Sequence, residues 1–148
     1  MATYNYYKLQ QGGIPSIKPG SNFFWIRLDY TLQPREINDD ARICEIKNHW
    51  VLKSGFTRTD GTAGVATANI DIGTSAGGNQ LDDAVDIDGA DTMTRMDTLD
   101  DDGPIAITAD GHIFVRMLTA AAYDGYTDIF IEVVVPNTDV EAGDSLAE

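Results

Sequence analysis

The sequence predicts an all-β fold, a single antiparallel β-sandwich or jelly roll of about seven or eight strands. The chain of 148 residues is the size of one domain. It is rich in Val, Ile, Thr and Tyr and contains 14 Gly and 5 Pro, a composition typical of strands joined by frequent turns. Several segments alternate apolar and polar residues, and no amphipathic stretch of about 10–15 residues separates them, as a parallel α/β sheet would require.

The clearest alternation begins at Phe23 and ends at Leu32. It predicts a long strand whose buried face carries Phe24, Ile26, Leu28, Tyr30 and Leu32. Arg42–Lys53 is predicted to be a second long strand, and Ser54–Thr62 the turn that follows it. The inward-facing residues of this second strand are Cys44, Ile46, Trp50 and Leu52.

The next stretch, Gly64–Asp91, begins as a strand and ends as an acidic segment. The strand places Ala66, Ala68, Ile70 and Ile72 on one face. Within the acidic part, Asn79–Ile87 is ambiguous, because its apolar residues have the i, i+3, i+4 spacing that allows a short helical turn.

The remaining strands are predicted to be shorter until the last. They comprise a strand around Thr92–Met96, a turn at Asp100–Gly103, a strand at Ile105–Thr108, a tight hairpin turn at Asp110-Gly111 and a strand at His112–Thr119. The last strand is Tyr126–Val135, and Pro136 ends it.

The two ends of the chain are predicted to lie outside the sandwich domain, which covers residues 23–136. Residues 1–22 form an N-terminal arm in which Tyr4, Tyr6 and Tyr7 precede a segment rich in Gly and Pro. Because tyrosine is enriched where protein surfaces meet, we expect the arm to pack on a neighbouring subunit or partner. An arm that folds back on its own domain and a disordered terminus are the alternatives. Residues 137–148 carry four acids and no base, which predicts a flexible acidic tail.

The net charge of −14 is distributed unevenly along the chain. Residues 1–58 contain eight Lys and Arg and five Asp and Glu, whereas residues 59–148 contain two basic and nineteen acidic residues. This charge opposes contact with nucleic acid or an anionic membrane. No apolar run approaches the roughly 20 residues that span a bilayer, and the first residues lack the pattern of a signal peptide. The single cysteine, Cys44, lies on the apolar side of its strand and is expected to be a buried thiol in a protein made in a reducing cytoplasm.

The sequence contains none of the motifs that carry common enzyme chemistry. Phosphate-binding loops, zinc-protease motifs and nucleophile elbows are absent, and the two histidines are far apart in sequence. Carboxylates are plentiful, but their number alone does not define a catalytic pair. We therefore expect no catalysis and no cofactor.

One acidic constellation is a weak candidate for a structural cation. Asp86, Asp88 and Asp91 follow Asp82 and Asp83, and alternating aspartates in a loop can offer several oxygen ligands to calcium. The spacing departs from an EF-hand loop, because Gly89 comes too early and no glutamate follows at the closing position. Solvated turn acids are the favoured interpretation, so the expected metal ligand set is none.

The order of these features resembles one protein family over roughly residues 23–135. The features are Tyr30-Thr31-Leu32, Ile43-Cys44-Glu45-Ile46, the segment Gly64–Gly73 with the Ser/Gly turns and acidic residues after it, Asp110-Gly111, Asp124-Gly125 and Ile129–Val135. Together they are similar to the small β-sandwich proteins of tailed bacteriophages that are described as decoration, cement or auxiliary head proteins.

The resemblance implies a structural protein of the virion. Such a protein would bind the outside of the capsid after assembly in the host cytoplasm and would bridge subunits of the major capsid protein. It would act as a homo-oligomer, with a trimer favoured, and would bind neither nucleic acid nor membrane. The expected contact residues are Tyr4, Tyr6, Tyr7, Phe23 and Trp25. The alternatives are a tail or head-fibre component and a carbohydrate-binding β-sandwich module, and exposed Trp25 and Trp50 would favour the latter.

Overall fold

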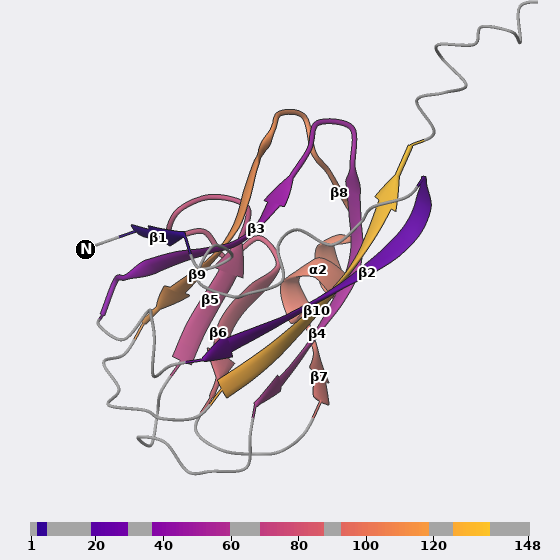
Figure 1. Ribbon diagram of the computed structural model, residues 1–148. Coiled ribbons are helices and arrows are strands. Elements are labelled where there is room, and N and C mark those ends of the chain that lie inside the picture. The colour runs from indigo at the N-terminus through magenta and orange to yellow at the C-terminus, as the bar shows by residue number, and fades with distance from the viewer. Residues whose placement is uncertain are drawn as a thin grey trace, which may run out of the picture.

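The computed structural model describes six parts of the chain (Figure 1), namely residues 3–5, 19–29, 37–59, 69–87, 93–118 and 126–136. The strands within them are β1 (Thr3–Asn5), β2 (Gly20–Asp29), β3 (Asp40–Ile46), β4 (Val51–Thr59), β5 (Asn69–Gly73), β6 (Asp82–Asp86), β7 (Met93–Arg95), β8 (Ile105–Ala106), β9 (Gly111–Met117) and β10 (Tyr126–Val135). A single short helix, α2 (Asp97–Asp102), occurs in the described residues.

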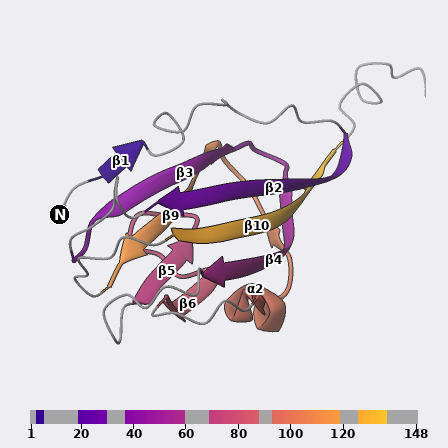
Figure 2. The same ribbon diagram turned by 60° about the horizontal axis from the view of Figure 1, so that its bottom comes forward.

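The strands form two sheets that pack face to face as a β-sandwich. The first sheet has the order β1-β3-β9-β5-β6, and the second has the order β2-β10-β4-β7, with β8 also paired to β4. Figure 2 shows β2, β10 and β4 side by side, with α2 next to β4. Every pairing is antiparallel except that of β1 with β3. The predicted fold class is confirmed. The strands outnumber the prediction because the predicted strand Arg42–Lys53 is divided between β3 and β4, and because β1 and β6 lie in segments that were not predicted to be strands.

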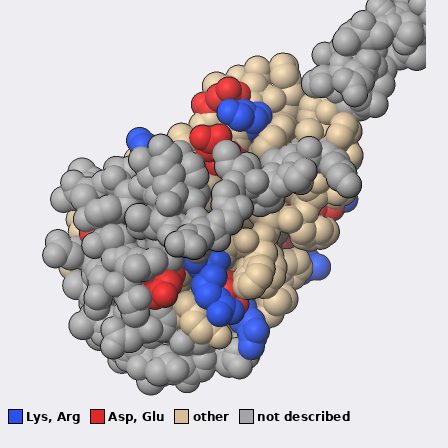
Figure 3. All heavy atoms as spheres, viewed as in Figure 1, with Lys and Arg blue, Asp and Glu red and all other residues tan. Residues whose placement is uncertain are grey.

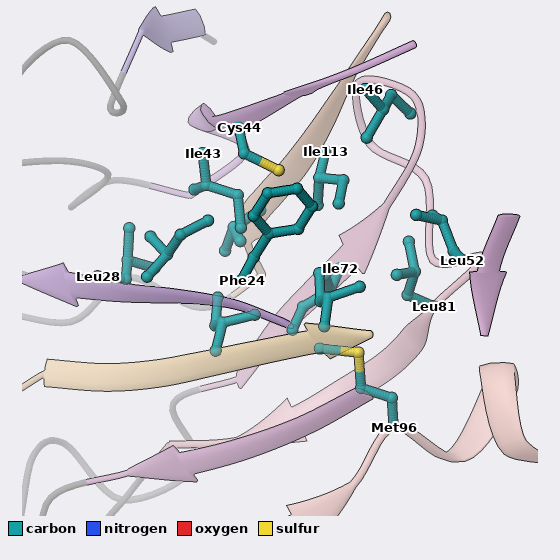
Figure 4. Packing of buried hydrophobic residues seen from close by; sticks show 14 of the residues in the cluster. Phe24, Leu28, Ile43, Cys44, Ile46, Leu52, Ile72, Leu81, Met96 and Ile113 are labelled. Atoms are coloured by element: carbon teal, nitrogen blue, oxygen red, sulfur yellow. The ribbon is translucent and has the colours of Figure 1, made fainter. Parts of the chain in front are cut away.

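The core lies between the two sheets and is built from alternate residues of the long strands. On β2, Phe24, Ile26 and Leu28 are buried, as the sequence predicts. On β10 the buried set is Ile129, Ile131 and Val133, and on β9 it is Ile113, Val115 and Met117. The labelled side chains in Figure 4 project into this space from both sheets. Burying this many apolar side chains is the main source of the stability of the fold.

The prediction of one continuous strand over Arg42–Lys53 is wrong. Residues 47–50 form a turn that separates β3, in the first sheet, from β4, in the second. His49 has a positive φ of 73°, and its backbone N–H donates to the carbonyl of Ile107 at 2.8 Å. The segment after Lys53, predicted to be a turn, continues β4 to Thr59. The inward positions Cys44, Ile46, Trp50 and Leu52 are nevertheless all buried.

The ambiguous stretch Asn79–Ile87 contains β6, which pairs with β5. Two further local predictions differ from the structure. The predicted turn at Asp100–Gly103 is the second half of α2, which Gly103 ends with a positive φ of 85°. Asp110-Gly111 is not a hairpin turn, because β8 before it pairs with β4 and β9 after it pairs with β3 and β5. The predicted strand around Thr92–Met96 is present as β7, and the last strand has the predicted bounds.

The predicted arm and tail fall largely outside the described residues. Residues 3–5 form β1, which extends the first sheet of the same chain by pairing in parallel with residues 40–42 of β3. Residues 6–18 and 137–148 are not among the described parts, and β2 begins at Gly20. No helix in the described parts is long and apolar enough to cross a membrane.

Candidate interaction surface

The second sheet exposes large apolar side chains on the face that points away from the core. Phe23 and Trp25 on β2 are 66% and 60% exposed, and Met93 on β7 is 57% exposed. They are three of the four large hydrophobic residues exposed in the described parts of the chain, the fourth being Ile37. Exposed apolar side chains gathered on one face are typical of a binding surface.

The strand register brings further aromatic and arginine side chains onto the same face. Directly paired residues across the four strands form two neighbouring rows. One row is Trp25, Phe130, Phe56 and Arg95, and the other is Arg27, Asp128, Arg58 and Met93. We call this surface the aromatic–arginine face, defined by Phe23, Trp25, Arg27, Phe56, Arg58, Met93, Arg95 and Phe130.

Cation–π contacts connect the arginines to the rings of this face. The guanidinium carbon of Arg27 lies 3.8 Å from the ring centroid of Tyr126 and 5.7 Å from that of Trp25. The guanidinium of Arg95 lies 5.9 Å from the ring of Phe56. Such contacts contribute about 0.5–1 kcal/mol each where the groups are exposed. They also restrict the positions that the long arginine side chains adopt.

Asp128 lies beneath the exposed residues at the centre of the second row. Its side chain is 3% exposed, and its Oδ1 accepts hydrogen bonds from Trp25 Nε1 at 3.1 Å and from Arg27 Nε at 2.8 Å. Arg27 Nη2 donates to Oδ2 at 3.0 Å, so the guanidinium and carboxylate form a bidentate pair. The hydrogen bond and the charge of Asp128 raise the pKa of Arg27. The carboxylate therefore fixes both the indole and the guanidinium.

Glu132 is the other acid of β10 on this face, and both of its carboxylate oxygens accept hydrogen bonds. Ser21 Oγ donates to Oε1 at 2.6 Å, and Ser54 Oγ donates to Oε2 at 2.9 Å. Lys53 Nζ lies 3.8 Å from Oε1. The two serine hydrogen bonds lower the pKa of Glu132, so this carboxylate stays ionised to a lower pH than usual.

The face differs from the rest of the described surface in charge. Its strands β2, β10, β4 and β7 carry four basic and three acidic residues. The other described residues include three basic and twelve acidic ones. In Figure 3, Lys and Arg atoms gather in the lower part of the view, beside the sheet that contains β2, β10 and β4 in Figure 1.

Of the five contact residues predicted from the sequence, the structure describes the side chains of two. Phe23 and Trp25 lie on the aromatic–arginine face. Tyr4 belongs to β1, whose backbone alone is described, and Tyr6 and Tyr7 lie outside the described residues. Sequence patterns did not indicate Phe56, because it falls in a segment predicted to be a turn.

The candidate cation ligands are only partly described. Asp86 is exposed on β6, while Asp88 and Asp91 lie outside the described residues. Asp82 is buried, and its Oδ1 accepts the backbone N–H of Asp97 at 3.1 Å. It thereby caps the first turn of α2 from a neighbouring strand. Among the residues described, no three His, Cys, Asp or Glu side chains are grouped so as to hold a metal ion.

Cys44 is a buried thiol, as the sequence predicts. Its side chain lies in the core and is 6% exposed. Burial raises the pKa of Cys44 to about 12, so the thiolate is not populated near neutral pH. Cys44 therefore offers no nucleophile.

Solved structures of similar fold come from phage capsids. A chain in the capsid of Ralstonia phage GP4 superposes with a TM-score of 0.65 at 15% identity, covering 93% of this chain and 99% of that one. A chain of the cyanophage Pam1 capsid asymmetric unit gives a TM-score of 0.56 at 14% identity, covering 87% and 96%. A chain of the acid-stable capsid of Helicobacter pylori bacteriophage KHP30 gives 0.53 at 8% identity, covering 82% and 92%.

These likenesses show a shared fold. The sequence itself matches no protein-family model and no curated protein.

Proposed function

We propose that this protein is a structural component of a phage virion that binds the outside of the capsid and reinforces it. Each copy bridges neighbouring subunits of the major capsid protein, with no catalysis and no cofactor. The protein is made and assembled in the host cytoplasm and acts as a homo-oligomer, with a trimer favoured.

One observation carries the proposal. The structural likeness to phage capsid chains covers nearly the whole of this chain and nearly the whole of each of those chains. The likeness therefore extends over the whole sandwich, and each of the three capsid chains is matched over at least 92% of its length. A sandwich of this fold is thus used in the capsids of several phages, which supports a structural role in a virion for this chain.

The contact residues in this proposal include Phe23 and Trp25. Both are more than half exposed on a strand whose alternate residues are core, so their positions are fixed by the fold while their side chains remain available. A stable contact buries about 800 Å² on each partner, and aromatic anchors near its centre supply much of its free energy. Tyr4, Tyr6 and Tyr7 of the N-terminal arm are proposed as additional contacts.

Cosedimentation with capsid shells tests the proposal. Shells of the same phage, assembled without this protein, are mixed with the purified chain and pelleted, and the bound copies per shell are counted. We expect saturable binding at a fixed ratio to the major capsid protein. A chain that stays in the supernatant at every concentration overturns the proposal.

A carbohydrate-binding module is the second candidate, because Trp25 offers an exposed indole held in a fixed orientation. Trp50, however, is 9% exposed and stacks on Phe24 in the core, so the pair does not line a groove. Binding of host polysaccharide that requires Trp25, without binding to capsid shells, would favour this function. A tail or head-fibre component would instead associate with tails or fibres and not with shells.

A further inference from the structure

We infer that the aromatic–arginine face binds a protein surface that presents both an apolar patch and carboxylates. The inference rests on the proposed function, which makes the partner surface part of the capsid shell. The kinds of chemical groups on that partner surface do not follow from the likeness in fold.

The apolar requirement comes from the two exposed aromatic residues of β2. Phe23 and Trp25 project from the same side of the strand, two residues apart. Trp25 is held by its hydrogen bond to Asp128, so little conformational entropy is lost when a partner covers the ring. Rigid, exposed aromatic side chains of this kind suit an apolar patch on the partner.

The carboxylate requirement comes from the basic side chains of the same face, which extend from Arg27 on β2 across the sheet to Arg95 on β7, the opposite edge strand. The side chains of Arg27, Lys53 and Arg95 are 45%, 57% and 65% exposed, and Arg58 lies beside them in the second row. Arg27 is already paired with Asp128 of β10, and Lys53 lies 3.8 Å from Glu132 of the same strand. The strands of the face nevertheless carry four basic residues against three acidic ones. An acidic partner would be repelled by the other described surfaces, where acidic residues outnumber basic ones by four to one.

The ion pairs already present on the face do not prevent this binding. Arg95 Nη1 lies 3.0 Å from Asp100 Oδ1, but both side chains are more than half exposed. Exposed pairs of this kind contribute little to stability, so Arg95 exchanges Asp100 for a partner carboxylate at small cost. The face is therefore ready to bind without rearrangement of the sheet.

The test compares variants of the full chain in binding to capsid shells assembled without it. Trp25→Ala and Phe23→Ala each remove one aromatic ring, and Arg95→Gln removes one charge from the face. Lys47→Gln is the matched control, because Lys47 is a half-exposed base in the turn between β3 and β4, away from the face. Phe23→Ala keeps the test valid if Trp25→Ala unfolds, because no hydrogen bond depends on the phenyl ring.

We expect Trp25→Ala to raise the dissociation constant about 30-fold, the scale of an aromatic anchor residue. Arg95→Gln is expected to weaken binding by roughly three- to tenfold and to reduce its sensitivity to added salt. Arg95→Lys should recover much of the loss, and Lys47→Gln should bind as the wild type does.

Three outcomes overturn the inference. If the wild type binds but Arg95→Gln matches Lys47→Gln and salt has no effect, the partner is not acidic, and the proposed function stands. If the variants alter the oligomeric state of the free protein and leave shell binding unchanged, the face joins copies of this chain. If the wild type does not bind shells at all, the proposed function fails together with the inference.

Discussion

The exposed indole of Trp25 donates a hydrogen bond to the buried carboxylate of Asp128, with 3.1 Å between Nε1 and Oδ1. The same carboxylate binds the guanidinium of Arg27 through both oxygens. The buried side chain of Asp128 thus controls the orientation of the exposed side chains of Trp25 and Arg27. The shape of the aromatic–arginine face depends on this one buried acid.

Replacing Asp128 with Asn should lower the free energy of unfolding by about 1–3 kcal/mol, because the bidentate pair with Arg27 is lost within a site of low exposure. Trp25 should also become more mobile. Denaturant unfolding measures the first effect, and quenching of tryptophan fluorescence by acrylamide measures the second. Quenching reports mainly on Trp25, because Trp50 is 9% exposed.

Asp101→Asn in α2 is the matched control for this prediction, because Asp101 is exposed. Equal stability and equal quenching in the two variants would contradict the role given to Asp128.

Removing the carboxylate of Asp40 is expected to lower the free energy of unfolding more than removing the charge of Asp128 does. The side chain of Asp40 is 2% exposed and forms a bidentate pair with Arg116, with distances of 2.6 Å and 2.9 Å. Its Oδ1 also accepts the backbone N–H of Gly77, which has a positive φ of 71°. Asp40→Ala leaves Arg116, itself 20% exposed, without its carboxylate, and should cost about 3–5 kcal/mol in chemical denaturation. A loss no larger than that of Asp101→Ala would show that the pair contributes little.

Asp82 should make stability depend on pH in the mildly acidic range. Burial raises the pKa of Asp82 from its ordinary value of 3.8 to about 6, against the lowering effect of backbone N–H donors. The folded state therefore favours the neutral acid, and the stability that this contributes is present below about pH 4 and is lost as the pH rises through about 6. Burial also raises the pKa of Asp71, which acts in the same direction.

The variant Asp82→Asn isolates this contribution, because the amide oxygen can still accept the N–H of Asp97 without a charge. The stability of the wild type relative to Asp82→Asn, measured by urea unfolding across this range, should fall as the pH rises. A difference that stays constant, or that grows with pH, would contradict the assignment.

Deleting residues 1–18 should leave the sandwich folded, because the deletion stops before β2 and, among the described residues, removes the short edge strand β1 alone. The loss of three backbone-paired residues should reduce stability by roughly 1 kcal/mol. Binding to capsid shells should weaken, because the arm is proposed as a contact. Unchanged shell occupancy of the folded truncated protein would remove the arm from the contact surface.

Strict alternation made the long strands predictable. The two faces of β2 and the bounds of β10 follow from it, because residues on a half-buried strand sort by polarity at every second position. The turn between β3 and β4 was missed because His49, and not a glycine, occupies the left-handed backbone conformation there. Beyond it, the pairing of β4 with β10 shifts register near Lys53, which breaks the alternation.

The interaction surface was predictable only in part. Phe23 and Trp25 stand out because they are aromatic residues on the polar side of a strand. Phe56 and Phe130 join them through strand register, which links residues far apart in sequence and leaves no local signal. The burial of Asp128 likewise depends on its cross-strand neighbours Arg27 and Trp25.

Electron cryomicroscopy of the native phage particle would show whether this protein lies on the capsid exterior. We expect density for this sandwich on the outer surface of the capsid, at positions set by the shell lattice and in fixed ratio to the major capsid protein. The aromatic–arginine face should point toward the shell. Particles with no such density, together with a freely soluble protein that associates with no particle, would contradict this expectation.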